Sequence, residues 1–458
     1  MGQPRVIIIG AGPSGVRCAE ALVAAGLHPT VVDEGRRDGG QIYRRQPENF
    51  TRPYAKLYGT EAEKAQSLHE SFDGLRGKID YLPETLAWNI FDGKVHVTKD
   101  ERIKALPYDA LVICSGATDR LMPVKGWHYA GTYSLGASQI ALKAQACAIG
   151  RQVVFMGTGP LLYLVASQYV KADATVAAVL DTSPFMRRVA ALPKLLARPA
   201  VLRHGFALVA ELKRAGVQVL TGITPLEIMG SPETGVQGVV IRDSSGKERS
   251  FDCDAVGMGY HLRPETQLAD LARCAFRFDQ ETRQWLPEVG EDGRTSVQGV
   301  YLAGDGMRVL GADAAEIGGR LAAMAVLKDF GFKVQEDKLQ RLREEQAKME
   351  RFRQGLAQAF PWPAQQAAQL PDEAIVCRCE AITAGELRRT VCEKGAQEAN
   401  RAKALCRVGM GRCQGRYCGN AGAEIIAHAA GIPVEQVGRL RGQAPVKPLS
   451  MAVREEVE

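Results

Sequence analysis

The sequence predicts an α/β fold with two dinucleotide-binding domains, followed by a small and mainly helical C-terminal domain. A glycine-rich pattern of strand, turn and helix occurs at residues 6–24 and again at 152–170, and such patterns open nucleotide-binding α/β domains. Four cysteines in two close pairs then follow a charged and proline-rich segment. We expect the first domain to comprise residues 1–118 and 291–332, with the second domain inserted at 119–290. A helical linker is expected at 333–374 and the cysteine-containing domain at 375–445.

The composition is that of a globular protein, and its modest positive charge suits the binding of anionic cofactors. The 458 residues suffice for two or three domains with separate cores. The net charge of +6 is spread along the chain, so no nucleic acid is needed to explain it and none is expected as a partner. No run approaches the roughly 18 apolar residues that a membrane helix needs. The N-terminus shows no basic and apolar export signal, so we expect a cytoplasmic protein.

The first glycine motif predicts a dinucleotide site. Val6–Ile9 form an apolar run typical of a central parallel strand that is buried on both faces. The glycines that follow allow a tight turn, close approach of the backbone to a pyrophosphate, and close packing of the next helix. That helix directs its N-terminal N–H groups at the phosphates. The candidate residues of this turn are Gly10, Gly12, Pro13, Ser14 and Gly15.

An acidic side chain for the ribose stands at the end of the second strand. Asp33 lies 18 residues after Gly15, where a carboxylate accepts hydrogen bonds from the ribose hydroxyls. Glu34 is its neighbour and is an equal candidate for this role.

Three further motifs resemble those of two-dinucleotide-domain flavoproteins, which are Rossmann-like and of the glutathione and thioredoxin reductase type. "GRRDGGQIYR" contains Gly39, Gly40 and Gln41 and resembles the segment that runs along the pyrophosphate and the flavin. "YDALVICSGATDR", with Ser115 and Gly116, resembles their A-T-G strand. "GVYLAGDG", with Gly304 and Asp305, resembles the late strand whose aspartate holds the ribityl chain. This resemblance implies that the first site binds FAD.

The second nucleotide fold departs from the pattern of a nicotinamide site. Its third glycine position is Leu162, which is expected to crowd the pyrophosphate. The acid at the end of its second strand is Asp181, and no arginine pair stands immediately behind it to take a 2′-phosphate. A second nucleotide site is therefore doubtful.

The sequence offers no catalytic residue. Cys114 has no partner for a redox C-x-x-C motif, and no Ser/His/Asp arrangement emerges.

The four tail cysteines predict a metal centre. Cys377 and Cys379 form C-x-C, and Cys413 and Cys418 form C-x₄-C after 33 intervening residues. Four thiolates can hold either a [2Fe–2S] cluster or a structural zinc, although the tight C-x-C is less usual for zinc. The tail resembles the [2Fe–2S] domain of bacterioferritin-associated ferredoxins, in which all four cysteines bind iron. The other seven cysteines are expected to be small buried apolar residues.

The whole chain resembles the α (A) subunits of heteromeric FAD/[2Fe–2S] amino-acid and opine dehydrogenases. Opine oxidase, D-hydroxyproline dehydrogenase and hydrogen cyanide synthase belong to this family. The resemblance implies a β subunit, similar to D-amino-acid oxidases, that carries its own FAD and oxidises a C–N bond. It also implies an FMN at a subunit interface, a respiratory electron acceptor, peripheral association with the inner membrane and a small ferredoxin-like γ subunit.

Two other functions fit parts of the sequence. A stand-alone NAD(P)H-dependent reductase could feed its own iron–sulfur tail, but Leu162 argues against it. A non-redox scaffold with a zinc tail is contradicted by the motifs around Gly39–Gln41 and Asp305.

Overall fold

The first parallel sheet is built from strands that are far apart in the sequence. The computed structural model describes residues 3–46 and 52–455. The strand order is β20-β7-β1-β2-β3, and neighbouring strands are parallel. The strands are β1 (Val6–Ile9), β2 (Thr30–Val32), β3 (Asp80–Leu82), β7 (Ala110–Ile113) and β20 (Val300–Leu302).

Two layers cover this sheet. On one face α1 (Pro13–Ala24) packs against α9 (Ala312–Asp329), next to α3 (Ala62–Asp73). On the other face, apolar residues of a second sheet share one core with β1 and β7. That antiparallel sheet has the order β23-β6-β5-β4 and consists of β4 (Leu86–Phe91), β5 (Lys94–Lys99), β6 (Arg102–Pro107) and β23 (Arg454–Glu455). Smaller elements at this end are α2 (Tyr54–Tyr58) and the single turns η1 (Gly59–Glu61) and η2 (Gly304–Gly306).

The second parallel sheet lies between β7 and β20 in the sequence. Its order is β12-β11-β10-β16-β9, with β9 (Thr132–Ser134), β10 (Gln152–Thr158), β11 (Thr175–Asp181), β12 (Gln218–Thr221) and β16 (Ala255–Tyr260). One face is covered by α4 (Leu135–Ala144), α5 (Pro160–Lys171) and α7 (Pro199–Arg214). The other face packs on a three-stranded sheet of β13 (Thr224–Ser231), β14 (Gly235–Arg242) and β15 (Glu248–Asp252).

Two short antiparallel strands join the two nucleotide-binding folds. β8 (Ala117–Asp119) leaves the first fold and β17 (Leu262–Pro264) returns to it, and the two strands pair with each other. α8 (Gln267–Leu271) and the hairpin of β18 (Phe276–Asp279) and β19 (Gln284–Pro287) follow before β20.

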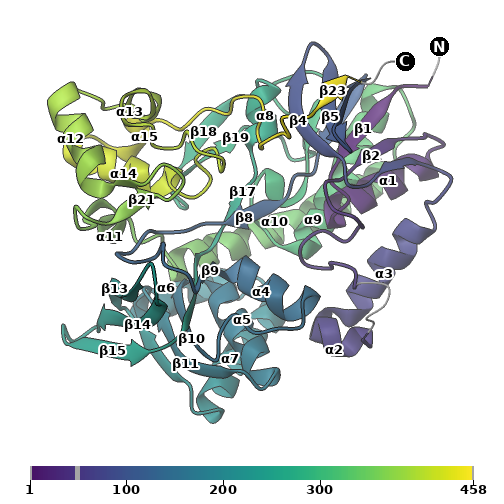
Figure 1. Cartoon of the computed structure of the whole chain (residues 1–458). Helices are drawn as coiled ribbons and strands as arrows, with labels where there is room; N and C mark the ends of the chain where they lie inside the picture. Colours follow the sequence, from purple (N-terminus) through teal and green to yellow (C-terminus); the bar gives the residue numbers. More distant parts are fainter. Residues whose placement is uncertain (1–2, 47–51, 456–458) are drawn as a thin grey trace.

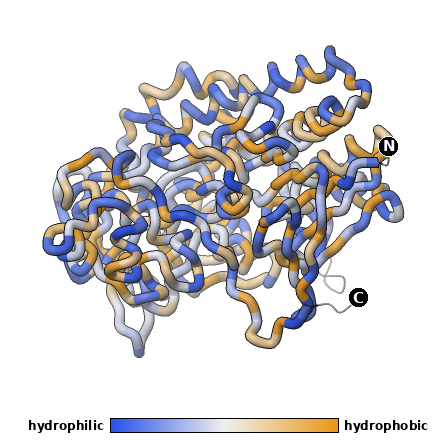
Figure 2. Tube along the Cα trace, turned by 90° about the horizontal axis from the view of Figure 1, so that it is seen from above, coloured by the Kyte–Doolittle hydropathy of each residue, from blue (hydrophilic) through white to orange (hydrophobic). Residues whose placement is uncertain are grey.

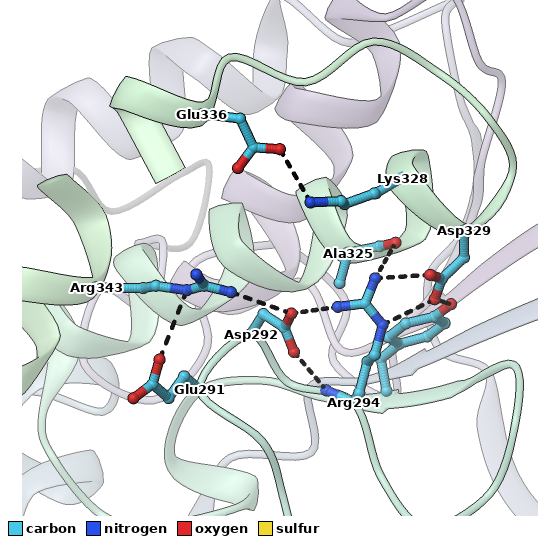
Figure 3. A network of polar contacts seen from close by, with 9 residues as sticks. Glu291, Asp292, Arg294, Ala325, Lys328, Asp329, Glu336 and Arg343 are labelled. Carbon is cyan, nitrogen blue, oxygen red and sulfur yellow. Dashed lines mark hydrogen bonds and ion pairs between the residues drawn. The ribbon is translucent and has the colours of Figure 1, made fainter. Parts of the chain in front are cut away.

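The linker contains a long helix that spans both folds. α10 (Glu336–Ala359) packs on α9 and on α6 (Phe185–Leu195). Its beginning is fixed to the first fold by two ion pairs, from Lys328 to Glu336 at 2.9 Å and from Arg343 to Asp292 at 3.5 Å. Figure 3 shows both pairs, together with Arg294, which contacts Asp292 and bonds Asp329 at 2.6 Å. These contacts therefore fix the direction in which α10 runs toward the C-terminal domain.

The C-terminal domain is small and mainly helical, as predicted. Its core is formed by a short hairpin of β21 (Ile375–Cys377) and β22 (Ile382–Thr383) with α12 (Ala384–Lys394), α13 (Ala399–Cys406), α14 (Gly419–Ala430) and α15 (Val434–Val437). α11 (Ala364–Ala368) packs against α14 from the linker side. The last residues then run back to the first domain, where β23 joins β6 near the N-terminus (Figure 1).

Polar and apolar segments are interleaved throughout the molecule, as Figure 2 shows. Within residues 3–46 and 52–455, no helix combines the length and the apolar character needed to cross a membrane.

Candidate functional site

The first glycine turn joins β1 to α1 at the carboxyl edge of the first sheet. Gly10 has φ +107°, and a Cβ there would lie 2.3 Å from the carbonyl oxygen of Cys114. A Cβ on Gly15 would lie 1.8 Å from the carbonyl oxygen of Gly10. Pro13 begins α1, and Ser14 is buried next to it. The turn therefore has room for bare backbone only, which is what a pyrophosphate at a helix N-terminus requires.

The two candidate ribose acids occupy different environments. The Asp33 carboxylate accepts hydrogen bonds from the N–H groups of Ala11, at 2.5 Å, and Gly35, at 2.6 Å. Burial raises the pKa of Asp33, and these two hydrogen bonds oppose the rise. Glu34 is half exposed and pairs with Lys447. Asp33 alone thus lies against the glycine turn, so the geometry favours it over Glu34.

The Gly39–Gln41 segment lies directly beside the glycine turn. The N–H of Gly39 donates to the carbonyl of Ala11 at 2.9 Å. A Cβ on Gly40 would lie 3.0 Å from the Cα of Gly12. Gln41 follows with an exposed side chain. The two segments that the sequence assigns to the pyrophosphate are therefore in backbone contact.

The ends of β7 and β20 complete the same edge of the sheet. Ser115 Oγ donates to the carbonyl of Glu265 at 2.6 Å, and the carbonyl of Gly116 accepts the N–H of Glu265 at 2.9 Å. Gly304 has φ +68°, and a Cβ there would lie 2.7 Å from Ser14 Oγ. All the strand ends predicted to surround the flavin therefore meet at one edge.

Asp305 shapes the entry to α9. Its Oδ1 accepts the N–H groups of Leu310, at 2.9 Å, and Gly311, at 3.0 Å. Burial raises the pKa of Asp305, and the two hydrogen bonds oppose that rise. The carboxylate thus fixes the loop that leads into α9.

The four tail cysteines lie in two facing pairs. Cys377 ends β21 and Cys418 precedes α14, and both are 1% exposed. The Cys418 thiol donates a hydrogen bond to Cys377. Cys379, which is exposed, and Cys413, which is half-buried, are hydrogen-bonded to each other. One pair is therefore buried while the other faces the surface.

Within the buried pair only Cys377 has surroundings that favour its thiolate, whereas the hydrogen bond to Cys377 and burial raise the pKa of Cys418. The hydrogen bond from Cys418, assisted by the backbone N–H groups of Gly409, Glu380 and Cys379, lowers the pKa of Cys377 to about 6. Backbone N–H groups directed at sulfur are the usual surroundings of protein-bound iron–sulfur clusters. Burial and the neighbouring Cys413 raise the pKa of Cys379.

The four thiols lie near one another, since Cys377, Cys413 and Cys379 each raise the pKa of Cys418. Four cysteine thiolates form a complete ligand set for a [2Fe–2S] cluster, as they do for a structural zinc. The donors of this site therefore fit the predicted cluster.

The crevice of the second nucleotide fold is filled by the linker. Nucleotides bind such folds outside the carboxyl ends of the parallel strands. Here Ser183, just after β11, donates through Oγ to the carbonyl of Ala359 at 2.5 Å. His261, just after β16, donates through Nε2 to the carbonyl of Phe360 at 2.6 Å. Trp362 follows and is buried, with its ring 5.9 Å from that of Tyr260. A nucleotide would have to displace this segment.

The candidate ribose acid of the second fold, Asp181, already accepts hydrogen bonds from other side chains and backbone of the chain. Asp181 is fully buried and accepts hydrogen bonds from Tyr163 Oη at 2.7 Å and from the N–H of Ser183 at 2.7 Å. Arg188 pairs with the same carboxylate at 2.6 Å, and its guanidinium lies over the rings of both Tyr163 and Phe360. Burial raises the pKa of Asp181, and Arg188 opposes that rise. Asp181 thus joins the linker contact and does not face an open ribose site.

Two expectations from the sequence need correction. Leu162 does not crowd the pyrophosphate position, because its side chain is fully buried in the core that α5 shares with β10 and β11. The obstruction comes from Phe360 and Trp362, whose only signal in the sequence is the helix-breaking "FPWP". Among the seven scattered cysteines, Cys147 and Cys392 are exposed.

Comparisons with known proteins agree with both cofactor sites. Residues 4–325 match the model of the pyridine nucleotide-disulphide oxidoreductase family, and residues 375–428 match the BFD-like [2Fe-2S] binding domain. Together they define an oxidoreductase that binds FAD and a [2Fe–2S] cluster. The chain belongs to the pyridine nucleotide-disulphide oxidoreductase family and, within it, to the relatives of the opine oxidase A subunits. The predicted flavin and iron–sulfur cofactors are therefore confirmed.

The relatives match over nearly their whole length. The A subunit of opine oxidase from Rhizobium meliloti is 37% identical over 98% of this chain and 86% of its own. Hydrogen cyanide synthase subunit HcnB of Pseudomonas aeruginosa is 28% identical over 97% of each chain. These are the relatives that the sequence motifs predict.

Solved structures confirm the fold class. L-proline dehydrogenase from P. horikoshii superposes with a TM-score of 0.71 at 20% identity, covering 99% of this chain and 79% of that one. Thioredoxin reductase of T. acidophilum covers 72% of this chain and 99% of its own, with a TM-score of 0.52 at 20% identity. The smaller coverage of this chain by the second structure is expected if the C-terminal domain is an added module.

Proposed function

We propose that this chain is the electron-transfer α subunit of a heteromeric flavin-dependent dehydrogenase. A partner β subunit of D-amino-acid-oxidase-like fold oxidises the C–N bond of an opine, an imino acid or an amino acid. Electrons then pass through the FAD and [2Fe–2S] sites of this chain to a respiratory acceptor. The names of the relatives, which are the A subunit of opine oxidase and the HcnB subunit of hydrogen cyanide synthase, support this role.

The observation that carries the proposal is the linker in the second nucleotide crevice. A stand-alone reductase needs an open nicotinamide site, and residues 359–362 lie where that site would be. A closed nicotinamide site supports the proposal that electrons reach the flavin from another protein.

The cofactor ligands are part of the proposal. FAD supplies the step from electron pairs to single electrons, and the cluster carries one electron at a time. The chain holds the pyrophosphate with backbone at the β1–α1 turn and the ribose with Asp33, and it anchors the loop before α9 with Asp305. We assign FAD binding to Gly10, Gly12, Pro13, Ser14, Gly15, Asp33, Gly39, Gly40, Gln41, Ser115, Gly116, Gly304 and Asp305, and cluster binding to Cys377, Cys379, Cys413 and Cys418.

The domain limits are proposed at residues 118, 290, 332 and 374. They are supported by the end of β7 at Ile113, the start of β20 at Val300, the start of α10 at Glu336 and the start of β21 at Ile375.

The test is to purify the chain with the proteins that accompany it in its host, and in parallel the chain alone. Each preparation is offered octopine, nopaline, D-hydroxyproline, proline and glycine with an artificial electron acceptor. We expect the complex to oxidise one of these compounds and the isolated chain to oxidise none. Turnover by the chain alone, or the lack of any stoichiometric flavoprotein partner, would refute the proposal.

A further inference from the structure

A buried ion pair joins the C-terminal domain to the segment that connects the two nucleotide-binding folds. Arg416 bonds the carboxylate of Glu265 through Nε at 2.6 Å and through Nη2 at 3.1 Å. The two side chains are only 8% and 11% exposed. Two parallel N–H···O bonds between a guanidinium and a carboxylate fix both distance and orientation.

One end of the pair rests on the flavin edge of the first sheet. Glu265 directly follows β17, which pairs with β8 in the connection between the two folds. Its N–H donates to the carbonyl of Gly116 at 2.9 Å, and its carbonyl accepts Ser115 Oγ at 2.6 Å. Ser115 and Gly116 are the strand end assigned to the flavin, so Glu265 is in contact with the wall of that site.

The other end rests on the loop that carries the second cysteine pair. Arg416 lies between Cys413 and Cys418 in the sequence. Its backbone N–H donates to the carbonyl of Cys413 at 3.1 Å, and its Nη1 donates to the same carbonyl at 3.3 Å. Nη1 also donates to the carbonyl of Val446 at 2.9 Å. The guanidinium therefore holds the shape of the loop on which two of the candidate iron ligands stand.

Neighbouring residues reinforce this junction. Gln267 Nε2 donates to the carbonyl of Gln414 at 2.8 Å, and Arg263 Nη1 donates to the carbonyl of Arg416 at 3.4 Å. Residues 263–267 thus form one strip of chain that touches the flavin edge on one side and the cysteine loop on the other.

The electrostatics of the junction keep the carboxylate charged. Burial opposes ionisation of Glu265, but Arg416 and Arg263 outweigh it and lower its pKa below the ordinary value. A positive charge close to cluster ligands favours the reduced cluster, whose net charge is more negative, and a negative charge disfavours it.

A buried interdomain ion pair is often only a structural clip. A second pair in this protein provides that comparison. Arg439 bonds Asp270 at 2.6 and 2.8 Å across the same domain boundary, without a hydrogen bond to Ser115 or Cys413. The Glu265–Arg416 pair differs from it in what each residue contacts. Glu265 is hydrogen-bonded to Ser115 and Gly116 at the candidate flavin site, and Arg416 is hydrogen-bonded to Cys413 at the candidate cluster site.

We propose that Glu265 and Arg416 are positioning residues for electron transfer, which hold the cysteine loop against the flavin edge and set the reduction potential of the cluster by their opposite charges. With both cofactors bound, the flavin would give up one electron for each electron that the cluster takes up. A two-electron-reduced flavin would need two such transfers, with the cluster reoxidised by the respiratory acceptor between them and the flavin protons released to solvent. The ion pair itself is neither oxidised nor reduced. This inference rests on the proposed electron-transfer function.

The test measures the cluster potential by redox titration of the full chain, followed by electron paramagnetic resonance. Arg416→Gln leaves the charge of Glu265 uncompensated and should shift the potential to more negative values. Glu265→Gln leaves the positive charge of Arg416 uncompensated and should shift the cluster potential to more positive values. We expect each single variant to change the flavin–cluster equilibrium about tenfold, which for one electron is about 59 mV. The double variant should return close to the wild-type potential.

The controls separate positioning from stability. Arg439→Gln and Asp270→Asn remove charges from the comparison pair and should move the potential much less. Arg416→Lys keeps the charge without the two-point bond, so it should keep the potential and slow flavin-to-cluster transfer after chemical reduction of the flavin. Shifts of the same sign in Arg416→Gln and Glu265→Gln, or shifts no larger than in the controls, would overturn the proposal. Because the titration uses this chain alone, its result does not depend on a partner protein.

Discussion

Replacement of Cys413 by serine is expected to abolish the visible absorption of the iron–sulfur cluster while FAD stays bound. Cys413 faces Cys379 in the outer thiol pair, so its loss would remove one of the four thiolates that would hold the cluster. Changes in groups that merely support metal ligands cost about 10–100-fold in metal affinity, and loss of a ligand should cost at least as much. The FAD residues lie on other strands, so the flavin spectrum should persist. Iron analysis and absorption spectra of the purified variant provide the measurement.

Cys392→Ser is the matched control for that experiment. Cys392 is exposed on α12 of the same domain. Its replacement should leave both iron content and flavin content at wild-type values. A Cys413→Ser protein that retains its cluster, or a Cys392→Ser protein that loses it, would contradict the ligand assignment.

The second large effect is expected from Gly10→Val, which should yield protein without FAD. The valine would have to adopt φ +107° and would place its Cβ 2.3 Å from the carbonyl oxygen of Cys114. Both atoms belong to adjacent strand ends, so the backbone of the pyrophosphate turn must move. Overpacking of this kind costs about 1–3 kcal/mol and backbone strain about 1–3 kcal/mol more. The flavin-to-protein ratio after purification measures the effect.

Gly26→Val is the control variant that shows whether backbone strain from a valine at positive φ is enough to cause loss of FAD. Gly26 follows α1 in the same domain with φ +86°, and the space around its Cβ position is open. This variant should be less stable than the wild type, yet bind FAD in full. If Gly10→Val kept its flavin, or if Gly26→Val lost it equally, the first glycine turn would not be the flavin site.

Local sequence patterns are sufficient to predict the elements around the flavin. The glycine turn after Val6–Ile9, the acid after the second strand and the late strand at Val300–Leu302 each depend on neighbours in the sequence. The helix expected in the linker is present as α10, and it ends at Ala359, shortly before Pro361. Which of Asp33 and Glu34 meets the turn could be decided only from coordinates, since adjacent residues point in different directions.

Contacts between distant segments could not be predicted in the same way. Phe360 and Trp362 are ordinary apolar residues, and nothing nearby in the sequence indicates that they fill a crevice formed by β10, β11 and β16. Glu265 and Arg416 are an ordinary acid and base that become partners only when the C-terminal domain packs on the segment that connects the two folds. The return of β23 to β6 likewise depends on the complete fold.

The most direct test of the central claim is to mix the purified chain with NADH or NADPH under anaerobic conditions and follow its flavin spectrum. Dithionite is added afterwards to show that the flavin and the cluster can be reduced. If the linker closes the nicotinamide site and electrons come from a partner protein, neither nucleotide will bleach the flavin, while dithionite will reduce both cofactors. Prompt bleaching by either nucleotide would contradict this account and identify the chain as a stand-alone reductase.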